Sequence, residues 1–160
     1  MENKVDIMSA SAIAIPMHVL AALAWVGGMF FAYVVLRPAA AGLETAQRLT
    51  LWKDVFDRFF PWAWAAVFLL PMTGYWMVQT DMGGFRNVGL HVHIMNGVGI
   101  LMTGLFIYLY GWPYRHFAEA VAAGDWPAAG VGIASIRRVV GINLALGVFV
   151  IVVGSSGRFW

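Results

Sequence analysis

The chain has 160 residues, of which 61% are hydrophobic and only 11% are charged, and its formal net charge is +2. Because a soluble domain carries roughly 25% charged residues, this composition argues against a soluble fold and favours a membrane protein. The small net charge gives no indication of a nucleic-acid partner. The absence of cysteine excludes disulfides, thiolate metal sites and a cysteine nucleophile.

Four apolar runs predict helices that cross a bilayer core of about 30 Å. They cover residues 11–36, 60–79, 90–110 and 139–154. Aromatic residues gather at the ends of the runs, as they do in the interfacial belts of membrane proteins. The sequence therefore predicts an all-α membrane protein in which residues 1–160 form a single four-helix transmembrane bundle surrounded by lipid.

The connections after the first and third runs also have helical patterns. In the first connection, apolar residues recur at helical spacing opposite a charged face: Leu49, Trp52, Val55, Phe56 and Phe59. This pattern predicts a short amphipathic helix that lies on the membrane interface or leads into the second run; the alternative is a solvated linker. In the third connection we expect a helical extension, a turn at Gly124 and Asp125, and a short second piece leading to Arg137 and Arg138.

Lysine and arginine residues are distributed unequally between the two sides of the predicted bundle. The first and third connections carry Arg37, Arg48, Lys53, Arg58, Arg115, Arg137 and Arg138, whereas the other side carries Lys4, Arg86 and Arg158. The positive-inside rule therefore places these two connections in the cytoplasm and both termini outside. In a bacterium this is a multi-pass protein of the inner (cytoplasmic) membrane, whose outer side faces the periplasm in Gram-negative species.

The predicted membrane interior contains no Asp, Glu, Lys or Arg, so its chemistry depends on histidine. His18 and His93 lie about 9 Å and 5 Å below the outer starts of their helices, given a rise of 1.5 Å per residue. Two imidazoles at similar depth can hold a metal or a haem, so both are candidate metal ligands. His91 is about 200° around the helix from His93 and is expected at the interface, and His116 is expected in the positive flank.

Stripes of small residues accompany the polar groups on three predicted helices. The stripes are His93, Gly97, Ile100 and Gly104; His18, Ala21, Ala22, Trp25, Gly28 and Met29; and Asn143, Gly147, Val150 and Gly154. Small residues permit close helix packing, but they also leave room for a flat macrocycle, and the sequence leaves both interpretations open. On the second interpretation, Trp25, Gly97 and Asn143 line a cofactor.

Methionines gather with the histidines in the outer half of the predicted bundle. They are Met8, Met17, Met77, Met82 and Met95. Thioether and imidazole ligands together suit Cu(I). Methionine is also an ordinary residue of apolar cores, and this second interpretation is favoured because no closely spaced methionine repeat concentrates the five.

Several motifs, in order along the chain, resemble a known family. Residues 17–29 (MHVLAALAWVGGM) resemble the opening helix of CopD-type copper-resistance membrane domains and of the related HemJ-type protoporphyrinogen oxidases. Further similar motifs are residues 59–62 (FFPW), 73–77 (TGYWM), 92–95 (VHIM), and 136–138 (IRR) leading to 143–147 (NLALG). Together they cover nearly the whole chain and are similar to those of small bacterial membrane proteins of the CopD family.

The resemblance carries expectations for particular residues. HemJ-type proteins bind haem b through a histidine of the first helix, which matches His18. They have a lysine at the opening of the third helix, where this chain has His93, and an Asn-Glu pair in the fourth, where Asn143 is followed by Leu144. These departures argue against protoporphyrinogen oxidase activity and favour haem ligation by two histidines. The longer CopD copper proteins have additional helices that this chain lacks.

The hypothesis from sequence is a haem b held by His18 and His93, between the first and third runs near the outer face, with a redox role. That role is electron transfer, or oxidation of a small or lipid-soluble partner such as a quinone, a porphyrin or a periplasmic redox protein. The alternatives are a copper-binding or copper-transport protein, a HemJ-like oxidase and a structural subunit. The sequence leaves a homo-oligomer open.

Overall fold

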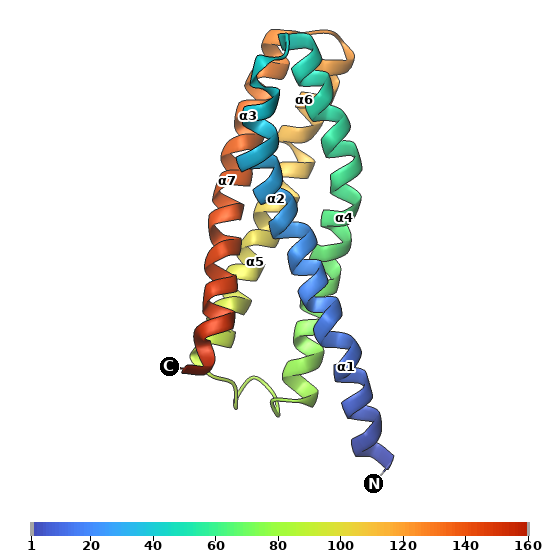
Figure 1. Ribbon diagram of the computed structural model, residues 1–160, viewed down its shortest axis with the longest axis vertical. Coiled ribbons are helices and arrows are strands. Elements are labelled where there is room, and N and C mark those ends of the chain that lie inside the picture. The colour runs from blue at the N-terminus through green and yellow to red at the C-terminus, as the bar shows by residue number, and fades with distance from the viewer. Residues whose placement is uncertain (1, 160) are drawn as a thin grey trace.

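The computed structural model describes the backbone of residues 2–159 and the side chains of residues 11–157 and 159. Within that part every regular element is a helix (Figure 1), which confirms the predicted all-α class. The elements are α1 (Glu2–Ala22), η1 (Leu23–Gly27), α2 (Gly28–Phe30), η2 (Phe31–Leu36), α3 (Arg37–Ala39), η3 (Ala40–Gly42), α4 (Thr45–Thr80), α5 (Leu90–Gly111), α6 (Pro113–Ala122), α7 (Trp126–Ser156) and η4 (Gly157–Phe159). The side chains of Lys4, Met8 and Arg158, and the whole of Trp160, lie outside the described residues.

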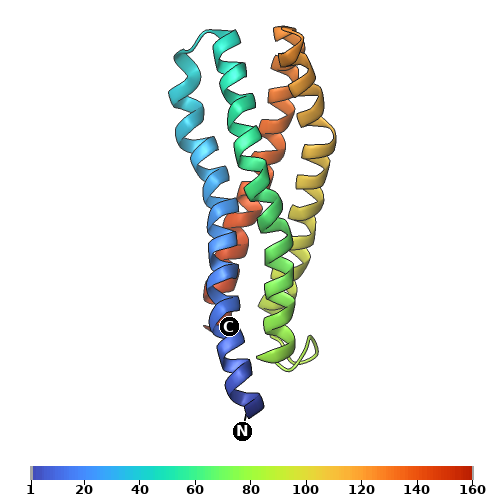
Figure 2. The ribbon, with the colours of Figure 1, turned by 90° about the vertical axis from the view of Figure 1, so that its right-hand side faces the viewer.

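The long helices lie side by side in an elongated bundle that has both chain ends at one end (Figures 1 and 2). The connections from α3 to α4 and from α6 to α7 lie at the opposite end. Three stretches are long and apolar enough to cross a membrane, namely Ser11–Gly42, Leu90–Ala122 and Trp126–Ser156. α4 runs alongside them, but the Trp, Tyr and Pro residues of its apolar second half lower its hydropathy.

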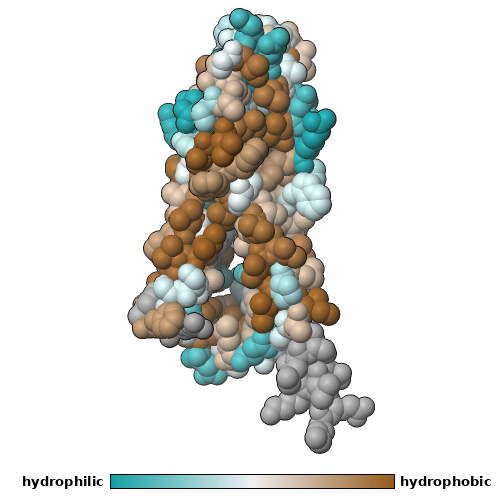
Figure 3. Space-filling view, viewed as in Figure 1, coloured by the Kyte–Doolittle hydropathy of each residue, from teal (hydrophilic) through white to brown (hydrophobic). Residues whose placement is uncertain are grey.

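The outer surface of the bundle is largely apolar, as a protein surrounded by lipid requires. Apolar side chains cover most of the face shown in Figure 3, and polar groups concentrate toward its ends. Large side chains on several helices are more than half exposed, among them Ile13, Leu20, Trp62, Phe68 and Val131. These surfaces are consistent with a lipid bilayer environment.

The structure decides between the two arrangements predicted for the first connection, and it extends the fourth predicted run toward the N-terminus. Residues 45–59 form the first part of α4 and continue directly into residues 60–79, so the amphipathic segment leads into the second run and is not a separate interfacial helix. Its apolar face packs in the core, where Leu49, Trp52 and Phe56 are buried. α7 likewise begins at Trp126 and not near residue 139, because helical hydrogen bonding continues into the interface, where Arg137 and Arg138 are exposed.

The predicted turn in the third connection is confirmed. Gly124 adopts a φ of +70°, a left-handed conformation that glycine reaches without a steric penalty. The Asp125 side chain then caps α7 by accepting a hydrogen bond from the Ala128 backbone N–H at 3.0 Å.

The first helix contains two π-helical stretches, η1 and η2. Such stretches are rare and interrupt the regular i to i+4 hydrogen bonding of an α-helix. η1 includes the buried Trp25. Directly after it, Gly28 allows the Phe59 ring of α4 to approach so closely that a Cβ at residue 28 would overlap the ring. The first helix is therefore fitted to α4 through local changes in its backbone.

The two halves of the bundle pack differently. In the packed half (residues 23–42, 45–69, 100–122 and 126–147), aromatic rings interlock across the helices. Phe106 of α5, for example, lies 6.0 Å from Trp25 and 5.1 Å from Trp64, measured between ring centroids. In the open half (residues 11–22, 70–80, 90–99 and 148–156), the α1–α4 pair diverges from the α5–α7 pair (Figure 1), and Figure 3 shows a hollow between the pairs.

Close helix approach at Gly132 predicts that substitution there destabilises the protein. An alanine Cβ at Gly132 would lie 2.9 Å from Phe117 Cβ and 3.1 Å from its Cα, and the backbone of α6 cannot move away cheaply. We expect Gly132→Ala to cost about 1–3 kcal/mol through overpacking and to lower the midpoint of thermal unfolding in detergent. The matched control is Gly104→Ala, where no atom lies within 4 Å of the added Cβ. A loss of stability at Gly104 equal to that at Gly132 would contradict this packing.

Candidate functional site

His18 lies on α1 against α4 in the open half, and its side chain is half-buried. Its Nδ1 atom is 2.8 Å from Thr73 Oγ1. The ring also lies along Gly74, where a Cβ would be 3.4 Å from His18 Cε1. A Cβ at residue 74 would therefore be in van der Waals contact with the imidazole.

The hydrogen bonds of Thr73 determine which nitrogen of His18 carries the proton. The Thr73 hydroxyl has one hydrogen, which it donates to the Leu69 carbonyl at 2.6 Å. Toward His18 the Thr73 oxygen can then only accept, so Nδ1–H is the donor. The neutral ring in this tautomer keeps the lone pair of Nε2 available. This is the arrangement in which a histidine binds a metal through Nε2 while a hydrogen bond to the other nitrogen fixes the ring.

His93 lies on α5 at the same end of the bundle, but its side chain is exposed. Its ring centroid is 6.1 Å from that of Phe85 in the loop before α5, and Phe85 in turn contacts Tyr75 of α4 at 5.7 Å. Between the described side chains, no hydrogen bond or ring contact joins His93 to His18. The pairing of these two residues as ligands thus stays a prediction.

The small-residue stripes divide into two kinds. On α7 they permit close packing, since a Cβ at Gly147 would lie 2.8 Å from Val26 and one at Gly154 would lie 2.9 Å from Met95. On α5 they do not, because no atom lies within 4 Å of a Cβ built at Gly97 or Gly104. Close packing therefore explains the glycines of α7, whereas the predicted stripe on α5 faces open space.

The two other predicted cofactor residues are buried. Trp25 is 3% exposed within the aromatic core. Asn143 is 2% exposed, and its Nδ2 donates to the Met102 carbonyl at 3.2 Å. Its Oδ1 is the one buried side-chain polar atom without a hydrogen-bond partner among the described side chains. Both residues belong to the packed half, where Trp25 contacts Phe106 of α5 and Asn143 of α7 bonds to Met102 of α5.

The other two histidines, His91 and His116, contact neighbouring parts of the chain. His91 packs against Gly157, where a Cβ would overlap its ring. His116 lies at the opposite end of the bundle, where its Nδ1 is 2.8 Å from the Trp112 carbonyl. His116 lies in the flank that carries the basic residues, as expected, whereas His91 is half-buried and His93 is the exposed one of the two.

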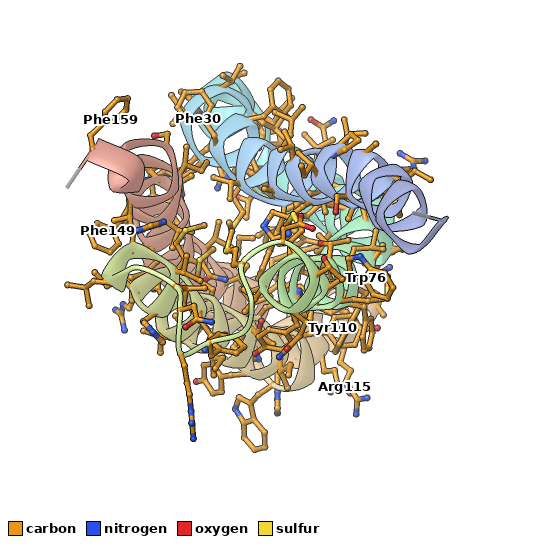
Figure 4. All side chains as sticks on the ribbon, turned by 90° about the horizontal axis from the view of Figure 1, so that it is seen from below. Phe30, Trp76, Tyr110, Arg115, Phe149 and Phe159 are labelled. Carbon is orange, nitrogen blue, oxygen red and sulfur yellow. The ribbon has the colours of Figure 1, made fainter. Side chains whose placement is uncertain are left out.

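The described residues of the open half include few side chains that could bind a metal ion. Among the described residues there is no group of three or more His, Asp or Glu side chains that could hold a metal ion. Figure 4, which looks along the bundle from the end with the termini, shows sulfur atoms among the side chains that project between the helices. Because the chain has no cysteine, these atoms are methionine thioethers. A metal in this half would therefore be bound by imidazole and thioether, or would bring ligands of its own.

The sequence marks residues 73–77 as a family motif, but it does not reveal that Thr73 and Gly74 contact His18. Thr73 and Gly74 hold the His18 ring, and Tyr75 of α4 donates to Asn96 Oδ1 of α5 at 3.0 Å. The three α4 residues are consecutive within an apolar run, and a threonine followed by a glycine there is the signal that could have drawn attention to them. Their partners could not be named before the pairing of α1 with α4 was known.

Comparison with known proteins gives one match. A family model described as Copper resistance protein D matches residues 53–156, from α4 to the end of α7. His93 lies within the matched part and His18 precedes it. No curated protein and no solved structure matches the chain.

The tautomer of His18 can be measured directly. Nitrogen-15 spectra of histidine-labelled protein should show His18 protonated at Nδ1, because Thr73 accepts from that atom. Thr73→Val keeps the shape of the side chain but removes the acceptor, so the His18 signals should shift toward the mixed tautomers of an unrestrained ring. Thr80→Val is the matched control, since the Thr80 hydroxyl donates to the Trp76 carbonyl. An unchanged His18 spectrum in Thr73→Val would contradict the assignment.

Proposed function

Because the chain belongs to the copper resistance protein D family, we propose that this multi-pass membrane protein binds copper in its open half, with His18 as a ligand. The observation that carries the proposal is the His18–Thr73 hydrogen bond at 2.8 Å, which leaves Nε2 free to bind a metal. An imidazole in an apolar environment is costly unless it is paired. The Nδ1 atom of His18 is paired with Thr73.

The proposed topology places this site on the outer side of the membrane. We take α4 as a fourth span, because it runs the length of the bundle beside the three apolar stretches and both termini lie at the same end (Figure 1). The excess of Lys and Arg at the opposite end indicates that this end is cytoplasmic. Copper would therefore reach His18 from the extracytoplasmic side, which is the periplasm in a Gram-negative bacterium.

The residues of the open half fit Cu(I) better than Cu(II). Imidazole and thioether are ligands that Cu(I) accepts, whereas carboxylate donors are absent from the described side chains around His18. The helix pairs diverge in the half of the bundle that contains His18, so a metal there would not require a rearrangement of the packed half. Thr73 orients the imidazole, and the apolar walls exclude water that would compete for the metal. This arrangement suits copper capture or transport at the membrane.

A second candidate, haem b with a redox role, is favoured by a specific observation. A macrocycle supplies four nitrogen ligands itself, so it needs only one or two from the protein, and the open half offers one imidazole that Thr73 holds. Gly97 leaves open space on α5. His93 would complete the pair only after its ring moved away from Phe85. Electron exchange with a quinone, a porphyrin or a periplasmic protein would then be the function.

Metal content distinguishes the two candidates. The purified protein, loaded with Cu(I) under reducing conditions, should retain copper by elemental analysis and lack a Soret band. His18→Ala should weaken copper binding, and Thr73→Val should weaken it about 10- to 100-fold, as the loss of a group that orients a ligand does. His116→Ala, at the other end of the bundle, should bind like the unmodified protein. A Soret band that His18→Ala removes would favour haem, and copper retention by His18→Ala would reject the proposed ligand.

The topology is tested separately with reporter fusions. A reporter that is active only in the cytoplasm should stay silent after Trp160 and should be active when inserted at Gly124, because the turn at Gly124 lies at the end with the excess of basic residues. A periplasmic reporter should give the opposite result at both positions. A strong cytoplasmic signal from the C-terminal fusion would reverse the orientation and place His18 on the inner side.

A further inference from the structure

A cavity lies in the packed half, far from His18, between the end of the first helix, α4 and α7. Its volume is about 430 Å³, within the range of about 300–1,000 Å³ typical of ligand pockets. Apolar side chains form most of its wall, including Leu49, Trp52 and Phe56 of α4 and Ile133 of α7. The proposed topology places this cavity at the cytoplasmic interface of the membrane.

Three arginines from three different elements line the same cavity, namely Arg37, Arg48 and Arg137. The Arg37 guanidinium lies 5.3 Å from the centroid of the Tyr33 ring. Arg48 is directed back toward the loop, with its Nη1 3.5 Å from the Ala41 carbonyl and 3.4 Å from the Leu43 carbonyl. These contacts orient the guanidinium groups but do not neutralise their charge.

No carboxylate compensates this charge among the side chains that the structure describes. Within residues 11–157 and 159, the one ion pair joins Lys53 to Asp57, and neither residue lines the cavity. Glu44 immediately precedes Thr45, which does line it, but Glu44 does not belong to the wall. The cavity therefore combines an apolar wall with three positive charges that have no acidic partner.

We propose that this cavity binds the phosphate headgroup and upper acyl chain of an anionic phospholipid from the cytoplasmic leaflet. Arginine matches phosphate because its planar guanidinium donates two parallel hydrogen bonds. Basic pockets between membrane helices on the cytoplasmic side are where such headgroups bind. The apolar wall fits the acyl chain, which a free anion would not need, so the combination favours a lipid over inorganic phosphate.

The bound lipid would also join elements that are distant in the sequence. Arg37 closes the first helix, Arg48 begins α4, and Arg137 lies within α7. A phosphate held by all three would offset their mutual repulsion and connect the first helix to α7 at this end of the bundle. The site is independent of the proposed metal site because it lies at the opposite end of the molecule.

Native mass spectrometry of the full-length protein in detergent tests the proposal with phosphatidylglycerol, phosphatidylcholine and inorganic phosphate as probes. We expect phosphatidylglycerol to bind most tightly. Arg37→Gln combined with Arg137→Gln should weaken it by about fivefold for each arginine removed. The matched control combines Arg58→Gln with Arg138→Gln, which removes the same charge at the same end of the bundle from residues that do not line the cavity. This control should bind phosphatidylglycerol like the unmodified protein.

A cavity-filling variant, Ala134→Leu, tests whether phosphatidylglycerol binding depends on the space in the cavity as well as on charge. It changes no charge and should weaken phosphatidylglycerol binding while leaving helix content by circular dichroism unchanged. Equal losses of binding in the two arginine double variants would overturn the proposal, because they would show attraction to net charge only. Binding of inorganic phosphate as tight as that of phosphatidylglycerol would also overturn it, since the occupant would then be a free anion.

Discussion

Hydrocarbon offers the backbone no hydrogen-bond partner, so each N–H and C=O group within the membrane must be paired inside its own helix. This constraint accounts for the helical fold and for the scarcity of polar side chains in the spans. It also applies to the few polar side chains that remain. Thr73 bonds to the Leu69 carbonyl and to His18, and Asn143 bonds to the Met102 carbonyl. These bonds tie His18 to α4 and Asn143 to α5, whereas Asn143 Oδ1 has no partner among the described side chains.

The distance between neighbouring helices distinguishes the packed half of the bundle from the open half. Where a small residue meets a large one, as Gly147 meets Val26, the helices approach closely and aromatic rings fill the remaining space. At Gly97 of α5 no such partner is present, and in this half the helix pairs diverge and leave a hollow. The packed half supplies most of the rigid core, so the open half can present a histidine without forming a dense core of its own.

The packed half and the open half also differ in charge. The packed half has arginines around an apolar cavity at its end, whereas the open half has an imidazole that Thr73 holds through a hydrogen bond. The first arrangement suits an anionic amphiphile, and the second suits a soft metal ion. Both use side chains that the fold holds from several helices, and neither depends on a catalytic set of charged residues within the spans.

The sequence by itself determined the helical class, the membrane environment and the turn at Gly124, because composition, apolar periodicity and local turn chemistry are properties of neighbouring residues. It also identified His18 as a polar group in an apolar run. It did not determine that residues 45–59 continue into α4, since both an interfacial and a continuous helix satisfy the same period. Only the tertiary structure decided that His18 meets Thr73, that His93 meets Phe85, and that Arg37, Arg48 and Arg137 share one cavity. Those contacts depend on which helices pair and how far they diverge, and helix pairing is set by the packing of residues distant in the sequence.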